Sequence, residues 1–202
     1  DDAMAYICEQ VYPKSQFYIM STDKDFMQLV SDRVTVWSPT KKKFYFKDTV
    51  LQDFKIPAHN FLLYRTMTGD DSDNIPGIKG VGVKTLQKRM PILFEDKKIT
   101  TEDILDFVEK SDDTSKIMKS ISESRDILEL NYKLMQLNDV NISGASKSEI
   151  IDIVKKPVNR LVKFQFQKMM LEDKLNTAIR NPDLWLRQCF FHLDVMAAKS
   201  YE

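Results

Sequence analysis

The first fifty residues alternate between helical and strand-like spacing of apolar side chains. Residues 1–12 place their apolar side chains on one helical face, with two acids in the first turn. Residues 17–20 form a short apolar run that breaks into a polar loop, which predicts a strand. Residues 33–48 alternate around a Ser-Pro-Thr-Lys turn, which predicts a hairpin. In that hairpin we expect Val34 and Val36 to lie opposite Phe44 and Phe46.

From about residue 50 onward the spacing is helical. Residues 57–67, most of residues 102–140 and the tail at 148–179 carry apolar side chains at helical intervals, and strand signals are almost absent. We therefore predict an α/β portion over residues 1–50 and a helical portion over residues 51–202.

The composition is that of an ordinary folded protein. The 202 residues include 30 basic and 30 acidic side chains, so net charge argues neither for nor against a polyanionic partner. No apolar run could span a bilayer and no targeting segment is visible, so we expect a cytoplasmic protein with no membrane contact. A helical pattern is already present at residue 2, and the sequence does not begin with an initiator Met. We therefore expect that the sequence was cut from a longer chain.

Acidic residues gather in three short clusters. Each cluster alone has an ordinary explanation, as a helix cap, a polar turn or a solvated loop. Together they suggest a cation site, because carboxylates brought close repel one another unless a multivalent cation binds them. Oxygen ligands without His or Cys favour Mg²⁺ or Mn²⁺, and a pair of such ions commonly serves the attack of water on a phosphodiester. The clusters are Asp1 and Asp2; Asp23 and Asp25; and Asp70, Asp71 and Asp73.

A basic, glycine-spaced segment follows the last acidic cluster directly. Gly77, Gly80 and Gly82 are three of the five glycines of the chain, and glycine lets a backbone approach a ligand closely. A helix over residues 83–89 would point the preceding amides at an anion. The GxxxxGK[ST] spacing of a nucleotide-binding loop is absent, so we expect sequence-independent contact with a nucleic-acid backbone. The basic side chains are Lys79, Lys84, Lys88 and Arg89.

Two motifs resemble those of the 5′-nuclease superfamily. These are "STDKDFMQLV" and "TGDDSDNIPGIKGVGVKTLQK", which match the TxDxD and GDxxDNIPGxxGxGxKT patterns of that family. The family includes flap endonucleases, the 5′→3′ exonuclease domain of bacterial DNA polymerase I, and bacteriophage 5′-exonucleases and ribonucleases H. The resemblance is strong up to about residue 90 and vague beyond it, where the tail looks more phage-like than bacterial.

The resemblance implies the C-terminal part of a Rossmann-like, PIN-like nuclease domain, followed by a helix–three-turn–helix region with a helix-hairpin-helix motif at about 69–89. It implies two-metal hydrolysis of phosphodiesters with Mg²⁺ or Mn²⁺, and K⁺ at the hairpin. Carried over residue by residue, the catalytic acids are Asp23, Asp25, Asp70 and Asp73, and the metal ligands also include Asp1 and Asp2. The DNA-binding residues are Lys79, Gly80, Gly82, Lys84, Thr85, Lys88 and Arg89, and the K⁺ ligands are the backbone of Gly77, Ile78 and Val81.

The sequence also departs from the family pattern. Ahead of Asp1 the family has a strand-ending aspartate, a motif glutamate and a basic helical arch, and this chain has none of them. We expect the fragment alone to bind metal poorly and to cleave little or not at all. The missing arch also accounts for the zero formal charge of a DNA-binding chain.

We expect a monomeric 5′→3′ exonuclease or flap endonuclease of replication or repair, in the host cytoplasm if phage-encoded. Its partners would be DNA with a 5′ flap or 5′ end, RNA–DNA primers, and replication proteins. Two alternatives stay open: a non-catalytic helix-hairpin-helix module that holds duplex DNA, and a glycosyltransferase that uses the Asp-x-Asp motif.

Overall fold

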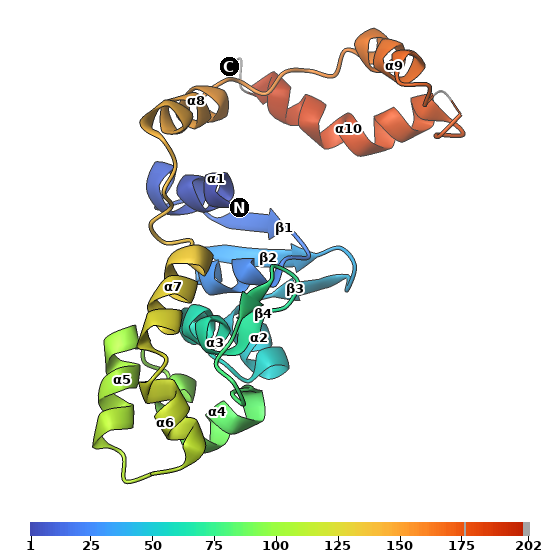
Figure 1. The fold of residues 1–202 in the computed structure, drawn as a ribbon. Coiled ribbons are helices and arrows are strands. Elements are labelled where there is room, and N and C mark those ends of the chain that lie inside the picture. The colour runs from blue at the N-terminus through green and yellow to red at the C-terminus, as the bar shows by residue number, and fades with distance from the viewer. Residues whose placement is uncertain (176, 200–202) are drawn as a thin grey trace. The chain divides into compact units, whose positions relative to one another are not determined.

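The computed structural model describes residues 1–175 and 177–199 (Figure 1). The chain forms two compact units, the first over Asp1–Ile142 and the second from Ser143 onward. The expected change from mixed to helical structure near residue 50 is therefore not a boundary between compact units, because helices on both sides of it belong to the first unit.

A three-stranded sheet lies at the start of the first unit. The strands are β1 (Phe17–Met20), β2 (Val34–Ser38) and β3 (Lys43–Tyr45), in the order β1-β2-β3. Strand β1 is parallel to β2, and β2 is antiparallel to β3. The strand expected at residues 17–20 and the hairpin that follows it are both confirmed.

The register of the hairpin corrects one expectation. Val36 pairs with Tyr45, and Trp37 pairs with Phe44. Because successive side chains alternate between faces, Val36 and Tyr45 are buried on one face, whereas Phe44 contacts Trp37 on the other with 4.4 Å between ring centroids. The expectation that Val34 and Val36 face Phe44 and Phe46 is therefore wrong by one position.

Helices account for most of the remainder of the first unit, as the spacing predicted. The first helix, α1, continues as a π-helical turn, and short 3₁₀ segments precede or follow several of the longer helices. The α-helices are α1 (Asp2–Tyr6), α2 (Lys47–Phe54), α3 (Phe61–Thr68), α4 (Val83–Arg89), α5 (Thr101–Lys110), α6 (Lys116–Ser122) and α7 (Arg125–Met135). The other helical segments are η1 (Ile7–Val11), η2 (Lys24–Leu29), η3 (Ala58–Asn60) and η4 (Pro91–Phe94).

The apolar faces of α3, α4, α5, α6 and α7 share one core. Fully buried residues of this core come from each helix, and α3 packs against α7. The residues include Met67, Leu86, Ile104, Ile121 and Leu128, each exposed by 1% or less. Burial of a large apolar side chain contributes about 1.5–3 kcal/mol to stability. This core therefore stabilises the position of α3, the helix that leads into the loop with Asp70 and Asp73.

A two-residue ladder, β4 (Gly69–Asp70) with β5 (Ile75–Pro76), interrupts the helical portion, where almost no strand signal was found. The ladder is too short to have a periodicity of its own. It depends on two glycines: a Cβ on Gly77 would lie 2.3 Å from the Thr68 carbonyl oxygen, and one on Gly69 would lie 2.3 Å from the Gly77 nitrogen. Gly69 also has a φ of +74°. The backbone therefore crosses itself at these glycines, at the base of the loop that carries Asp70 and Asp73.

The second unit is helical, as the tail predicted. Its helices are α8 (Gly144–Val154), α9 (Lys163–Glu172) and α10 (Pro182–Lys199). Helices α9 and α10 meet through aromatic rings, with Phe166 stacked on Trp185 at 5.7 Å between centroids, and the Leu161 amide donates to an Asp194 carboxylate oxygen at 3.0 Å. Across the described residues, none of the helices combines the length and the apolar character that a bilayer crossing needs.

We expect Gly77→Ala to lower the free energy of unfolding by about 3 kcal/mol, because the new methyl group would overlap backbone atoms that cannot move aside. The measurement is urea unfolding followed by circular dichroism. Gly82→Ala is the matched control, since a Cβ at that position meets nothing within 4 Å; its effect should stay within about 0.5 kcal/mol. Equal effects of the two substitutions would contradict the crossing.

Candidate metal and nucleic-acid site

Three of the predicted acids come together in space. Carboxylate oxygens of Asp25, Asp70 and Asp73 all lie within 4.8 Å of one another, and we call these residues the acidic group. Among the described residues it is the one set of three or more His, Cys, Asp or Glu side chains with such spacing. The side chains of Asp25 and Asp70 are 14% and 12% exposed, and Asp73 is exposed. The group therefore has two sheltered carboxylates and one that faces solvent.

Asp25 owes its place to the end of strand β1. The chain leaves β1 at Met20 and turns into η2, whose N-cap is Asp23. A carboxylate oxygen of Asp23 accepts the Asp25 amide at 2.8 Å, and the Ser21 hydroxyl accepts the Asp23 amide at 3.1 Å. This capping fixes Asp25 just beyond the carboxyl end of a strand, where α/β folds place ligand-binding residues.

Asp70 and Asp73 are positioned by the turn between β4 and β5. Asp70 Oδ1 accepts both the amide and the hydroxyl of Ser72, at 2.9 and 2.6 Å. Asn74 has a φ of +57°, a left-handed conformation that Asn tolerates better than most residues do. The turn therefore folds back on itself and brings Asp73 beside Asp70.

Helix α7 connects to both segments of the acidic group. Asn131, 2% exposed, donates from Nδ2 to the carbonyls of Thr66 and Pro76, at 2.9 Å each, and so joins the chain before and after the acidic turn. Gln28 of η2 donates to the Met135 carbonyl at 2.9 Å and accepts the Leu137 amide at 3.0 Å. Because η2 also carries Asp25, one helix fixes the two segments relative to each other.

Arg65 supplies positive charge to the acidic group. Its guanidinium contacts Asp25 Oδ1 through Nε and Nη2, at 3.2 and 3.1 Å, and it forms an ion pair with Asp70. Burial raises the pKa of Asp25 above its ordinary value, and the charges of Asp23 and Asp73 add to the rise, whereas Arg65 opposes it. The site therefore favours added positive charge even with Arg65 in place.

Three predicted metal ligands lie outside the acidic group. Asp1 is the N-cap of α1 and Asp2 lies in its first turn, both exposed, and neither belongs to the group. The carboxylate of Asp23 caps η2 instead of joining the three acids, although its charge still acts on Asp25. Asp71 is exposed in the turn and also lies outside the group.

The basic segment, residues 77–89, lies next to the acidic turn in the chain. Its lysines Lys79, Lys84 and Lys88 are exposed, as are Gly80 and Gly82. Gly80 has a φ of +80°, and its carbonyl accepts the Thr85 hydroxyl at 3.3 Å. Arg89 is held differently, in an ion pair with Asp113. The Ser115 amide, which donates to Asp113, is the main cause of the lowered pKa of that carboxyl, and Arg89 adds to the lowering. The three lysines, and not Arg89, therefore present free charge to an anionic partner.

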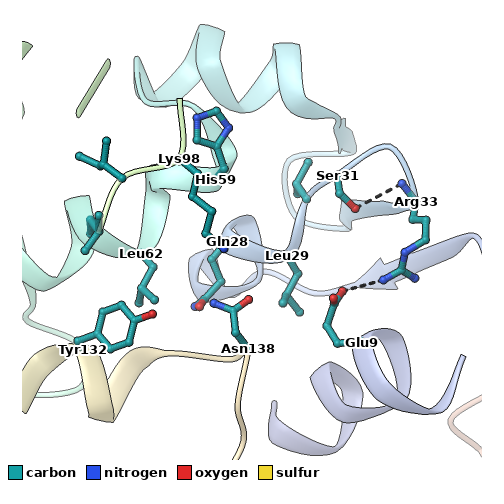
Figure 2. A pocket seen from close by; sticks show the side chains of 13 residues that line it. Glu9, Gln28, Leu29, Ser31, Arg33, His59, Leu62, Lys98, Tyr132 and Asn138 are labelled. Carbon is teal, nitrogen blue, oxygen red and sulfur yellow. Dashed lines mark hydrogen bonds and ion pairs between the residues drawn. The ribbon is translucent and has the colours of Figure 1, made fainter. Parts of the chain in front are cut away.

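A cavity of about 300 Å³ lies elsewhere in the first unit and is lined by none of the predicted site residues (Figure 2). Gln28, Tyr132 and Asn138 lie on one side of it, and His59 and Lys98 on another. The His59 Nε2 atom is buried and is without a hydrogen bond among the described residues. The cavity has no carboxylate cluster, so it is not a second candidate for the metal site.

Arg65 and Asn131 were not predicted from the sequence. A weak signal existed for each, since both are polar residues at apolar positions of helices, in "LLYRTMTG" and "LELNYKLM". A buried polar side chain needs a partner. Arg65 has one nearby in Asp70, but its other partner, Asp25, and the partners of Asn131 lie 40 to 65 residues away in the chain. Helical spacing alone could not identify them.

Comparisons with known proteins point to one group of enzymes, although no family model matches the chain. The chain is 33% identical over 190 residues to a 5′-3′ exonuclease of Aquifex aeolicus, covering 93% of this chain and 60% of the relative. It is 27% identical over 132 residues to the flap endonuclease Xni of Pseudoalteromonas translucida, covering 64% of this chain and 48% of the relative. The chain thus spans about half to three fifths of these relatives.

The fold has a match among solved structures. A flap endonuclease of bacteriophage T5, solved as a complex with DNA and metal ions, aligns with a TM-score of 0.56 over 85% of this chain and 58% of the other, at 22% identity. At that identity the match shows the fold alone. It confirms the expected PIN-like α/β class.

We expect Asp25→Asn to raise the melting temperature of the cation-free protein at neutral pH by a few degrees. Since the pKa of Asp25 is raised in the folded state, its contribution to stability is present at acidic pH and is lost as pH rises through that pKa. Asparagine avoids this loss, and Arg65 keeps Asp70 as a partner.

The check is thermal unfolding in EDTA from pH 4.5 to pH 8, with the exposed Asp71→Asn as the matched control. The gain should shrink toward acidic pH and be absent in the control. A variant that melts below the parent at every pH would contradict the assignment of burial as the dominant effect on Asp25.

Proposed function

The chain belongs to the 5′-nuclease superfamily, and from this membership we propose that it forms the cation-binding and DNA-holding part of a nuclease. The reaction is hydrolysis of phosphodiester bonds near 5′ ends of DNA or RNA-primed DNA, by 5′→3′ exonuclease or flap endonuclease action. The names of the relatives support this activity, and the T5 complex with DNA supports the substrate.

One observation carries the proposal. Acids more than forty positions apart in the sequence converge on one point, with a segment of exposed lysines directly after them in the chain. A protein that only held DNA would gain nothing from carboxylates beside phosphates, because their charge weakens binding unless a cation intervenes. This argument also disfavours the non-catalytic module.

The acidic group fits a divalent cation. All of its donors are carboxylate oxygens within 4.8 Å of one another, and hard oxygen donors suit Mg²⁺ or Mn²⁺ better than softer metals. Asp25, Asp70 and Asp73 would hold the first ion. Asp23, Asp1 and Asp2 are the proposed supply of carboxylates for a second ion. Bound ions of this kind stabilise negative charge that develops on a phosphate during hydrolysis.

The basic segment would hold the substrate. Lys79, Lys84 and Lys88 are free to pair with phosphates, and Gly80 and Gly82 leave open space at the surface where a backbone could approach. Contact of this kind carries no sequence information, which suits an enzyme that recognises the end of a strand. Binding of K⁺ by the backbone of Gly77, Ile78 and Val81 stays a prediction. Two of these residues are hydrogen bonded to each other, since the Ile78 carbonyl accepts the Val81 amide at 3.0 Å.

We expect Asp70→Asn/Asp73→Asn to weaken Mn²⁺ binding by at least about tenfold, because two charges next to the ion are removed. Because the chain alone is expected to cleave little, cleavage is tested in a full-length relative, where the equivalent substitutions should abolish Mg²⁺-dependent cleavage of a 5′-flap duplex. The measurements are calorimetric titration with Mn²⁺ and a gel assay of cleavage, and Asp71→Asn is the control. If the double variant of the relative cleaved as fast as its parent, the catalytic role of these acids would be refuted. A relative that bound DNA but showed no cleavage with Mg²⁺ or Mn²⁺ would favour the binding module.

We expect Lys84→Ala/Lys88→Ala to weaken binding of duplex DNA about equally for all sequences. The slope of log affinity against log salt concentration should become shallower by about two, roughly one for each lost phosphate contact. Fluorescence anisotropy at several salt concentrations measures it. The control is Lys14→Ala/Lys133→Ala, which removes the same charge from exposed positions outside the basic segment. An equal change of slope in both double variants would show that overall charge, not this segment, binds DNA.

A further inference from the structure

Arg65 lies between two carboxylates of the acidic group. Its Nε and Nη2 atoms both reach Asp25 Oδ1, and Nη2 also pairs with Asp70 Oδ2. Asp25 follows strand β1 and Asp70 belongs to β4, so a single guanidinium bridges the two segments that make the site. A planar guanidinium with five donors can do this, whereas an ammonium group would act as a single point charge.

The burial of these groups makes the bridge strong. Arg65 is 9% exposed, and its two partners are nearly as sheltered. The backbone next to Arg65 is also held in place, because Asn131 donates to the carbonyl of Thr66, the next residue in α3. Removing one member of a buried ion pair leaves the other charge uncompensated, which costs far more than the loss of a surface pair.

Arg65 leaves donor oxygens for a cation. It occupies Oδ1 of Asp25 and Oδ2 of Asp70, and Ser72 occupies the other oxygen of Asp70. Among the described residues, Oδ2 of Asp25 and both oxygens of Asp73 carry no hydrogen bond. The three acids bring a charge of −3, and Arg65 reduces it to −2, the charge that one divalent ion neutralises.

We propose that Arg65 is a positioning residue that holds Asp25 and Asp70 together when no cation is bound and limits the charge that the acidic group can accept. This inference rests on the proposed function of that group as a cation site. Arg65 acts as a resident counter-charge. It preserves the site without metal, and it weakens the binding of the metal that enters.

Two substitutions separate position from charge. We expect Arg65→Met to lower the melting temperature in EDTA by several degrees, because the carboxylates then repel without compensation. The same variant should bind Mn²⁺ at least about tenfold more tightly than the parent, because a positive charge has left the site. Arg65→Lys keeps the charge but not the bridge, so it should melt below the parent while its Mn²⁺ dissociation constant stays within about threefold of the parent value.

The measurements on the 202-residue chain are thermal unfolding in EDTA and calorimetric titration with Mn²⁺. Arg33→Met is the matched control, since Arg33 pairs with Glu9 at 2.9 Å in the same unit, outside the acidic group; its Mn²⁺ affinity should equal that of the parent. A merely structural role for Arg65 predicts unchanged or weaker Mn²⁺ binding in Arg65→Met, and that result would overturn the inference. If Arg65→Met does not fold in EDTA, a Mn²⁺ dissociation constant of Arg65→Lys more than about threefold from the parent value would overturn it equally.

The outcomes also distinguish this inference from the proposed function. If the parent binds Mn²⁺ and Arg65→Met binds it no more tightly, the role of Arg65 fails and the cation site stands. If neither protein binds Mn²⁺, the cation site itself fails, and the inference fails with it.

Discussion

Carboxylates held within 4.8 Å of one another repel, and the framework around the acidic group has to hold them in place against that repulsion. Part of the answer is charge, because the guanidinium of Arg65 touches two of the three acids. The other part is rigidity. The glycine crossing at Gly69 and Gly77 allows no side chain at either position, so the base of the acidic turn has little freedom to open.

Rigidity at one turn would not be enough, because Asp25 comes from a different segment. Helix α7 and the residues directly after it hydrogen bond to both segments. Asn131 bonds to the chain on both sides of the acidic turn, and the Met135 carbonyl and the Leu137 amide bond to Gln28. Helix α7 itself is held by the core it shares with α3, which includes Leu128. Apolar burial in this core therefore contributes to the relative placement of the acids.

The sequence predicted the parts of this arrangement that are local. The strand before Asp25, the helices, and the acids at 25, 70 and 73 all have signals within a few residues, and the motif resemblance assigned them to one site. It predicted neither Arg65 nor Asn131, which connect segments 40 to 65 positions apart, nor the β4–β5 ladder, which is too short for a periodicity. The motif also placed Asp23 among the metal ligands, and that role stays a prediction; in the structure the Asp23 carboxylate caps η2.

The zero net charge of the chain conceals a separation of acidic from basic residues. Positive and negative charge are separated within a few residues, with the acidic turn before Gly77 and the lysines after it. A phosphate held by those lysines would lie near carboxylates, so under the proposed function DNA binds better when a cation is present. Linkage is reciprocal, and DNA must then raise the affinity for the cation by the same factor. Under the proposed function, tighter cation binding with DNA and tighter DNA binding with the cation are therefore one consequence of the same charge arrangement.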